Sequence, residues 1–182
     1  MAKVSLSVIS IILILFVQGC HRQNTAKVQD SPYQSVDGEF AKIAGTWKSD
    51  DGLWEITISK DGKIASALIP MCVKELKPNH TTEVEMIDGG KSYFETGDFT
   101  LSYDETNNYM EVMLEITNID VRLGENVVQG NTVYVYSGNL SNDSGGWDTQ
   151  RTEVFDFGPR FPMNDPNNPD VTPVFFRKKA AQ

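Results

Sequence analysis

The sequence has few of the residues on which most metal sites and hydrolases depend. Its 182 residues include only two cysteines and two histidines. It has no Cys-x-x-Cys pair and no His-x-x-x-His spacing, so the usual ligand sets of zinc are missing. A Gly-x-Ser-x-Gly elbow, a phosphate-binding loop and a dinucleotide fingerprint are also absent. We therefore expect no bound metal, no cofactor and no catalytic activity.

Positive charge is scarce as well. Sixteen Lys and Arg residues stand against 25 Asp and Glu residues, which gives a net charge of −9. Nucleic-acid binding needs clustered basic residues, and the one short cluster lies at 177–179. We expect no nucleic-acid partner. Apolar residues make up 40% of the chain, which is enough for a core, and the length suggests one domain.

Only one long apolar run occurs, and it lies at the N-terminus. Every residue from Val8 to Val17 except Ser10 is apolar. A membrane-spanning helix needs about 20 such residues, so this shorter run is typical of a secretion signal. The run ends in the tetrapeptide VQGC at 17–20.

This tetrapeptide resembles the lipobox of bacterial lipoproteins, in which an aliphatic residue and a small residue precede a cysteine. The resemblance implies that 1–19 is a signal peptide and that Cys20 receives lipid, including acyl chains such as palmitate. Each buried methylene contributes about 0.8 kcal/mol, so two or three chains would anchor the protein firmly to a membrane. Because His21 rather than Asp follows Cys20, we expect the outer membrane of a bacterial envelope, with the protein facing the periplasm.

Lipidation of Cys20 would leave Cys72 as the remaining thiol, which excludes a disulfide within one chain. Cys72 lies in the apolar run IPMCV at 69–73, which predicts a buried side chain. An intermolecular disulfide or a reactive thiol is the alternative. Residues 20–40 are polar without periodicity, so we expect a lipidated N-terminus followed by a flexible tether.

From Gly45 onward, apolar residues recur at every second position, which is the period of a strand with one buried face. Trp54, Ile56 and Ile58 share one face, and 109–116 alternates in the same way. Asp-Gly and Asn-Asn pairs supply hairpin turns. We expect residues 41–182 to form one all-β domain with little helix, an antiparallel barrel or sandwich of about eight or nine strands. Further strands are expected at 63–69, 81–87, 99–103, 132–140, 151–157 and 171–177.

Two segments interrupt this pattern. Residues 141–150 are polar and predict a loop around Trp147. Residues 158–173 hold five of the eight prolines and cannot pair regularly, so we expect them to lie across one end of the barrel.

The sequence Gly45-Thr46-Trp47, followed by the Asp-Gly pair at 51–52, resembles the opening of a lipocalin-like barrel. In that superfamily a Gly-x-Trp motif begins the first strand, and the tryptophan fills the closed end. The resemblance implies that Gly45 and Trp47 are structural, and that a late arginine, either Arg151 or Arg177, packs over Trp47. Small envelope lipoproteins of bacteria begin their domains with a similar pattern.

A barrel of this kind offers its mouth to a small apolar or amphipathic ligand, and we expect non-catalytic binding there. The candidate binding residues are aromatic residues of the C-terminal third, Tyr134, Tyr136, Phe155 and Trp147. An aromatic residue in a polar loop often contacts another molecule. The alternative is therefore a solid core, with an envelope protein docked on Trp147 and the proline-rich segment.

Paired carboxylates leave a second alternative, a hydrolase. Glu83 and Glu85 share one strand face, as do Glu111 and Glu115. Neighbouring carboxylates can shift apart in pKa and act as acid and base. Solvent-facing strand residues explain the same pattern without chemistry.

Overall fold

The computed structural model describes residues 38, 40–85, 90–123, 126–158 and 169–180. In this part of the chain there are ten strands and no helix, so the all-β prediction is confirmed. The strands are β1 (Gly45–Ser49), β2 (Glu55–Ile58), β3 (Ile64–Ile69), β4 (Cys72–Leu76), β5 (Thr81–Glu85), β6 (Lys91–Asp104), β7 (Tyr109–Leu123), β8 (Asn126–Leu140), β9 (Gly146–Asp156) and β10 (Asp170–Lys178).

All ten strands belong to one antiparallel sheet in the order β4-β3-β2-β1-β10-β9-β8-β7-β6-β5. β1 pairs with β10, so the first and last strands join the two runs of hairpins. The sheet curls into a nearly closed barrel. Among the described strands, β4 and β5 are the edges that carry no partner on one side, although they follow one another in the chain. We call the boundary between them the seam.

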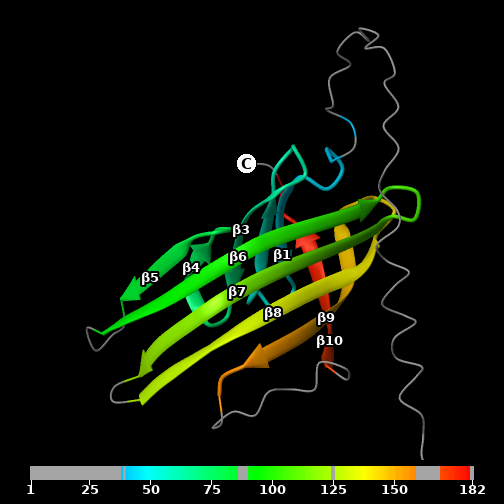
Figure 1. The fold of residues 1–182 in the computed structure, drawn as a ribbon. Helices are drawn as coiled ribbons and strands as arrows, with labels where there is room; N and C mark the ends of the chain where they lie inside the picture. Colours follow the sequence, from blue (N-terminus) through cyan, green and yellow to red (C-terminus); the bar gives the residue numbers. More distant parts are fainter. Residues whose placement is uncertain (1–37, 39, 86–89, 124–125, 159–168, 181–182) are drawn as a thin grey trace, which may run out of the picture. The chain divides into compact units, whose positions relative to one another are not determined.

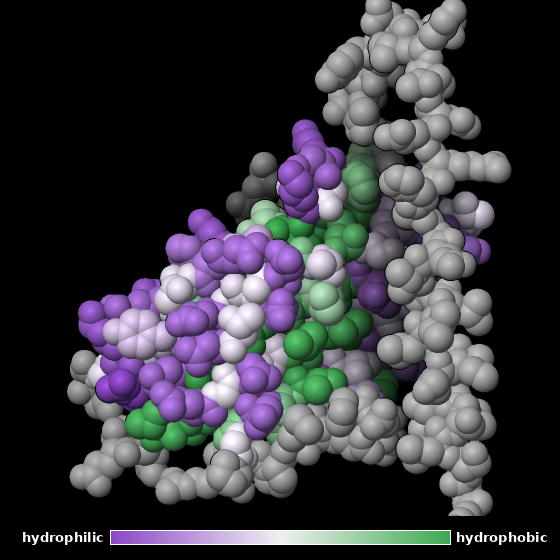
Figure 2. Space-filling view, viewed as in Figure 1, coloured by the Kyte–Doolittle hydropathy of each residue, from purple (hydrophilic) through white to green (hydrophobic). Residues whose placement is uncertain are grey.

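The long strands β6, β7 and β8 run across the other strands in Figure 1. Each has 14 or 15 residues, which is long for a barrel strand. The β6–β7 register shifts between Glu95 and Phe99, and the β7–β8 register shifts between Ile116 and Ile119. Such bulges bend strands and let a long hairpin follow the curve of a barrel. The outer face over β6 is largely hydrophilic (Figure 2).

An aromatic core fills the barrel beside β1, β8, β9 and β10. The rings of Trp147 and Phe176 stack with centroids 5.2 Å apart, and Trp47 meets Trp147 edge-on at 6.2 Å. The Trp47 indole donates a hydrogen bond to the carbonyl oxygen of Ile43 at 2.8 Å. We use the name aromatic core for five buried residues: Trp47, Trp54, Tyr136, Trp147 and Phe176.

Lysine, rather than arginine, covers the first tryptophan. The Lys178 ammonium lies 5.9 Å from the centre of the Trp47 ring, because these residues are register partners on β10 and β1. Arg151 instead lies 4.8 Å over Trp54, and Arg177 lies 5.0 Å over Phe175. The expectation that Arg151 or Arg177 packs over Trp47 is therefore wrong. Each cation still shields an aromatic face from water.

Three turns use the same Ser-x-Asp sequence, beginning at Ser49, Ser59 and Ser141. Each serine hydroxyl donates to the aspartate two residues later and accepts a backbone amide across the turn. The Ser141 amide also donates to the carbonyl oxygen of Gly146 at 2.9 Å. These bonds close the last turn by residue 145, so β9 begins at Gly146. The loop predicted at 141–150 is therefore wrong over its second half.

Glycine lets β8 and β9 approach closely. A Cβ atom added to Gly138 would lie 1.9 Å from the carbonyl oxygen of Asp148. No L side chain fits that space without moving the backbone of β9. The same approach lets the Gly138 carbonyl oxygen accept a hydrogen bond from the Trp147 indole at 3.4 Å.

Candidate functional site

The seam is tied at one end by the turn that joins β4 to β5. The Thr96 hydroxyl of β6 accepts the His80 amide at 3.0 Å and donates to the carbonyl oxygen of Lys77 at 2.5 Å. The Asn79 amide donates to the carbonyl oxygen of Gly97 at 2.9 Å. Asn79 has a φ of 52°, a left-handed turn conformation that Asn tolerates. Backbone and hydroxyl bonds to β6 thus fix the turn between the two edge strands.

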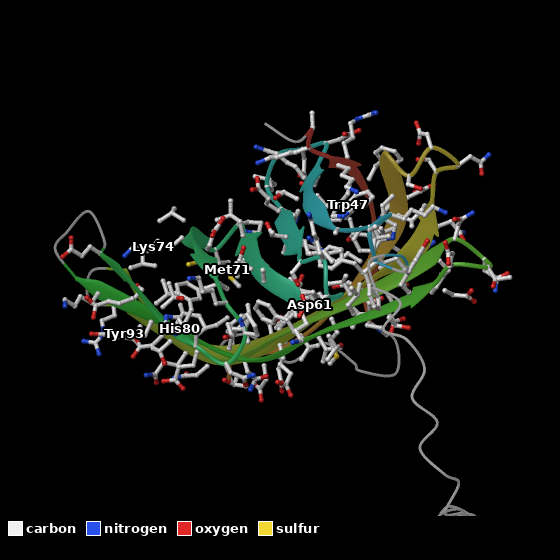
Figure 3. All side chains as sticks on the ribbon, turned by 90° about the horizontal axis from the view of Figure 1, so that it is seen from above. Trp47, Asp61, Met71, Lys74, His80 and Tyr93 are labelled. Carbon is white, nitrogen blue, oxygen red and sulfur yellow. The ribbon has the colours of Figure 1, made fainter. Side chains whose placement is uncertain are left out.

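Farther along the seam, where β4 and β5 share no backbone ladder, a side-chain hydrogen bond joins the two strands. The Lys74 ammonium on β4 donates to the carbonyl oxygen of Glu83 on β5 at 2.7 Å. Beyond this contact lie Met71, in the turn before β4, and Glu85, at the end of β5. Met71 and Lys74 lie together and apart from Trp47 in Figure 3.

A pocket of about 240 Å³ lies at this part of the seam. Val84 and Phe94, which are 5% and 1% exposed, form its floor together with the partly buried Val121. Met71 and Val73, which are 42% and 82% exposed, form its rim. We call this site the seam pocket; its lining is Met71, Val73, Val84, Glu85, Ser92, Phe94 and Val121.

The strand pattern explains both the floor and the rim. On β5, Val84 points inward because it alternates with the exposed Glu83 and Glu85. β4 does not alternate: Cys72 and Leu76 are buried, and the three residues between them are exposed. Val73 therefore points away from the core on an edge strand, which pairs with β3 alone. An exposed Val and Met beside a concave apolar floor form a continuous apolar surface rather than scattered exposed residues.

Two polar residues belong to the lining. Ser92 is 1% exposed, and its hydroxyl accepts the backbone amide of Arg122 at 3.2 Å. Glu85 is exposed and carries the only charged side chain among the lining residues that the structure describes. A mostly apolar surface with a few polar groups is the usual composition of a small-molecule site.

The volume of the seam pocket limits the size of the ligand that it can enclose. An apolar cavity of about 150 Å³ holds a benzene molecule, whereas sites for larger ligands begin at about 300 Å³. The seam pocket, at about 240 Å³, has room for one substituted ring or a short alkyl chain. Any longer molecule would extend past Met71 and Val73 into solvent.

The predicted binding tyrosines lie in the core instead. Tyr134 and Tyr136 are 2% and 0% exposed and meet the Trp54 ring at 5.0 and 5.6 Å. Burial raises the pKa of both hydroxyls above the ordinary value. Phe155 is half-buried and stacks on Phe157 at 5.4 Å. The seam pocket includes none of the predicted aromatic residues.

Trp147 is not in a loop. It is the second residue of β9 and is 0% exposed, packed between Trp47 and Phe176. The expectation of a surface position is wrong, because the short Ser-x-Asp turn returns the chain to the sheet one residue before it. The proposed docking role for Trp147 assumed an exposed side chain, and this side chain is buried. The proline-rich segment lies mostly outside the described residues.

Gly45 and Trp47 occupy the positions expected of a structural motif. Gly45 has a φ of 127°, which L side chains rarely adopt, at the first residue of β1. Trp47 is fully buried where the turn at 40–43 approaches the aromatic core. Cys72 is also buried as predicted, and burial raises the pKa of its thiol.

The glutamate pairs lie on outer strand faces. Glu83 pairs with Lys91 at 2.6 Å, and this contact lowers the pKa of the Glu83 carboxyl. A general acid needs a shift in the opposite direction. Glu111 is exposed and Glu115 is half-buried on β7. Within the described ranges, no group of three His, Cys, Asp or Glu residues is arranged to hold a metal ion.

The pocket residues were not predicted from the sequence, although one apolar run indicated an exposed apolar surface. Residues 69–73 are all apolar and span a turn at Pro70 and Met71. This turn reverses the chain between β3 and β4, so not all five side chains can face the core. Three of them, Pro70, Met71 and Val73, are exposed, and Met71 and Val73 line the pocket.

The N-terminal predictions lie outside the described residues; these are the signal peptide at 1–19, the lipidated Cys20 and most of the tether at 20–40. No helix of the described segments is long and apolar enough to cross a membrane. Comparisons with protein-family models, with curated proteins and with solved structures found no match.

Proposed function

We propose that this chain is a non-catalytic binding protein that takes a small apolar or amphipathic ligand into the seam pocket. The observation that carries the proposal is the position of the pocket at the unpaired boundary of the sheet, with an apolar floor and rim. β5 pairs with β6 without a register shift, and β6 pairs regularly with β7 over Tyr93–Glu95, so the floor is preformed. A preformed site needs little ordering when the ligand binds.

The lining favours binding over catalysis. The Ser92 hydroxyl contacts a backbone amide, and no histidine is among the pocket's described lining residues. A serine nucleophile needs a neighbouring general base that is itself oriented by another group. The exposed Glu85 is suited to recognising a charge rather than to acting as a buried acid.

The same proposal includes an envelope location. The VQGC sequence at 17–20 supports lipidation of Cys20, which would hold the barrel at a bacterial membrane facing the periplasm. Cells fed an alkyne-labelled palmitate would incorporate the label into the wild-type chain and not into a Cys20→Ser variant. Equal labelling of both chains, or an equal membrane fraction of both, would refute the anchor.

Native mass spectrometry of the compact unit Ser35–Gln182 tests ligand binding directly, because this unit contains all ten strands. We expect 1-hexanol to add its mass to the wild-type unit. Val73→Lys should abolish the adduct because it places a charge on the apolar rim. Val171→Lys is the matched control, since Val171 is 54% exposed and does not line the pocket.

Two results would refute the pocket. One is a wild-type unit that keeps its bare polypeptide mass at every hexanol concentration. The other is an adduct that Val73→Lys and Val171→Lys weaken equally, since this would indicate nonspecific attachment.

The unpaired edges favour a second candidate function, docking of another envelope protein. A free strand edge can extend into a partner's sheet, and Val73 on β4 is 82% exposed. Lys74 and Glu75 on the same strand oppose this, because charged residues on an edge discourage pairing. If docking is the function, Val73→Pro should abolish crosslinks to an envelope protein in cells, while hexanol adds no mass to the purified unit.

A further inference from the structure

We infer that the ligand of the seam pocket carries a protonated amine on its apolar body. This inference rests on the proposed function and specifies its ligand class. It follows from how the charges around the pocket are paired.

Glu85 stands directly opposite Lys91 in the β5–β6 register. Lys91 nevertheless reaches diagonally to Glu83, where its ammonium lies 2.6 Å from a carboxylate oxygen. The Glu83 carboxylate also accepts the Tyr93 hydroxyl, which contributes to lowering its pKa. Lys91 is thus paired with Glu83, and Glu85 acts on its ammonium only through a weaker electrostatic attraction, without forming an ion pair with it.

The other nearby cation is engaged too. The Lys74 ammonium donates to the carbonyl oxygen of Glu83, on the backbone of β5. Within the described part of the chain, no ion pair involves Glu85. Among the described lining residues, the single charge is therefore a carboxylate that belongs to no ion pair.

An unpaired carboxylate beside an apolar floor selects one kind of amphipathic ligand. An anion would be repelled by Glu85 and by the net charge of −9. A neutral molecule would gain only the apolar contacts with Val84, Phe94 and Val121. A protonated amine gains those contacts and adds a charge-assisted hydrogen bond at the entrance.

The expected preference is modest because Glu85 is exposed. Exposed ion pairs contribute about 0.2–1 kcal/mol, which corresponds to an affinity ratio of up to roughly fivefold. The ratio should also shrink as salt is added, because salt screens exposed charges. A larger, salt-independent preference would indicate a buried pair, which the exposure of Glu85 does not support.

Three molecules of equal chain length separate the alternatives: hexylamine, 1-hexanol and hexanoate. The full chain is held in nanodiscs of neutral phosphatidylcholine at pH 7, and the methyl NMR signals of Val84 and Val121 report binding. We expect hexylamine to bind more tightly than hexanol, and hexanol more tightly than hexanoate. Comparing protein variants in identical nanodiscs cancels the partition of each molecule into lipid.

Glu85→Gln should make hexylamine and hexanol bind equally and leave the hexanol affinity unchanged. Glu111→Gln is the matched control, an exposed glutamate on β7 outside the pocket, and should preserve the preference. Glu83→Gln should weaken the preference, because it releases Lys91 to pair with Glu85.

Equal binding of hexylamine and hexanol to the wild-type chain would overturn the amine inference while the proposed pocket stands. A preference that survives Glu85→Gln would overturn it as well. Failure of all three molecules to shift the Val84 and Val121 signals would overturn the proposed function, and this inference with it.

Discussion

The two parts of the barrel differ in how their interiors are filled and in how their strands are paired. Beside β1, β8, β9 and β10, the aromatic core is filled by large rings, and every strand has a partner on each side. At the seam, two edge strands are held by a turn and by one lysine, and apolar side chains remain exposed. The difference teaches that the filled part of the barrel and the apolar pocket are separate, because the pocket lies where two edge strands fail to pair.

The largest expected effect comes from emptying the aromatic core. Trp147→Ala removes a fully buried ring that packs on Trp47 and Phe176. We expect a loss of about 3–5 kcal/mol in the free energy of unfolding, measured by urea denaturation. Where the variant remains folded, hexanol affinity should be unchanged. A loss of affinity in the folded variant would mean that the two parts are not separate.

A medium effect is expected from the turn that ties the seam. Thr96→Val removes the hydroxyl that bonds to Lys77 and His80, which should cost about 1–3 kcal/mol. The change should be local, with faster hydrogen exchange at the amides of Asn79 and His80.

Thr149→Val is the matched control in the other part of the barrel. The Thr149 hydroxyl is buried and donates to the carbonyl oxygen of Val174 at 2.9 Å. This variant should lower the overall stability without accelerating exchange at Asn79 and His80. Faster exchange at those amides in both variants would show that the seam and the aromatic core unfold as one unit.

A smaller effect is expected at the lysine that bridges the seam. Lys74→Met removes the bond to the Glu83 carbonyl oxygen and should change the unfolding free energy by less than about 1 kcal/mol. Ligand exchange should become faster, because β4 and β5 separate more easily. Line-shape analysis of the Val84 methyl signal during a hexanol titration measures that rate. An unchanged rate would mean that Lys74 does not control access.

The smallest effect concerns pH and the turn between β1 and β2. A hydrogen bond from Ser49, followed by one from the Leu53 amide, lowers the pKa of the Asp51 carboxyl below 3.8. Because the pKa of Asp51 is lower in the folded state, its ionised carboxylate stabilises the fold at pH values above the pKa of the unfolded state. This contribution is lost as the pH falls through the pKa of the folded state. Wild-type unfolding free energy should therefore drop more between about pH 5 and pH 2 than that of Asp51→Asn. Equal drops would refute the contribution of Asp51.

Strand alternation predicted most of the fold because burial follows it closely. Trp54, Ile56 and Ile58 are buried as their spacing predicts, and the seven strand regions expected by residue range each contain a strand. β4 was missed because only its first and last residues are buried. The ten strands exceed the predicted eight or nine for this reason, and β6, β7, β8 and β9 extend beyond the ranges that alternation predicted.

The site could not be predicted in the same way. The seam pocket depends on which two strands fail to pair, and that is a property of the whole sheet rather than of any local pattern. Tyr134, Tyr136 and Trp147 were candidates because they are aromatic, yet aromatic residues gain most by being buried. Composition shows that such residues exist and does not show on which side of a strand they lie.

The most direct test of the account is a crystal structure of Ser35–Gln182 grown with bromobenzene, using the anomalous signal of bromine to locate the ligand. We predict one strong bromine site between Val84, Phe94 and Val121, in contact with Met71 and Val73. A bromine site among the rings of the aromatic core, or no site in either part of the barrel, would contradict it.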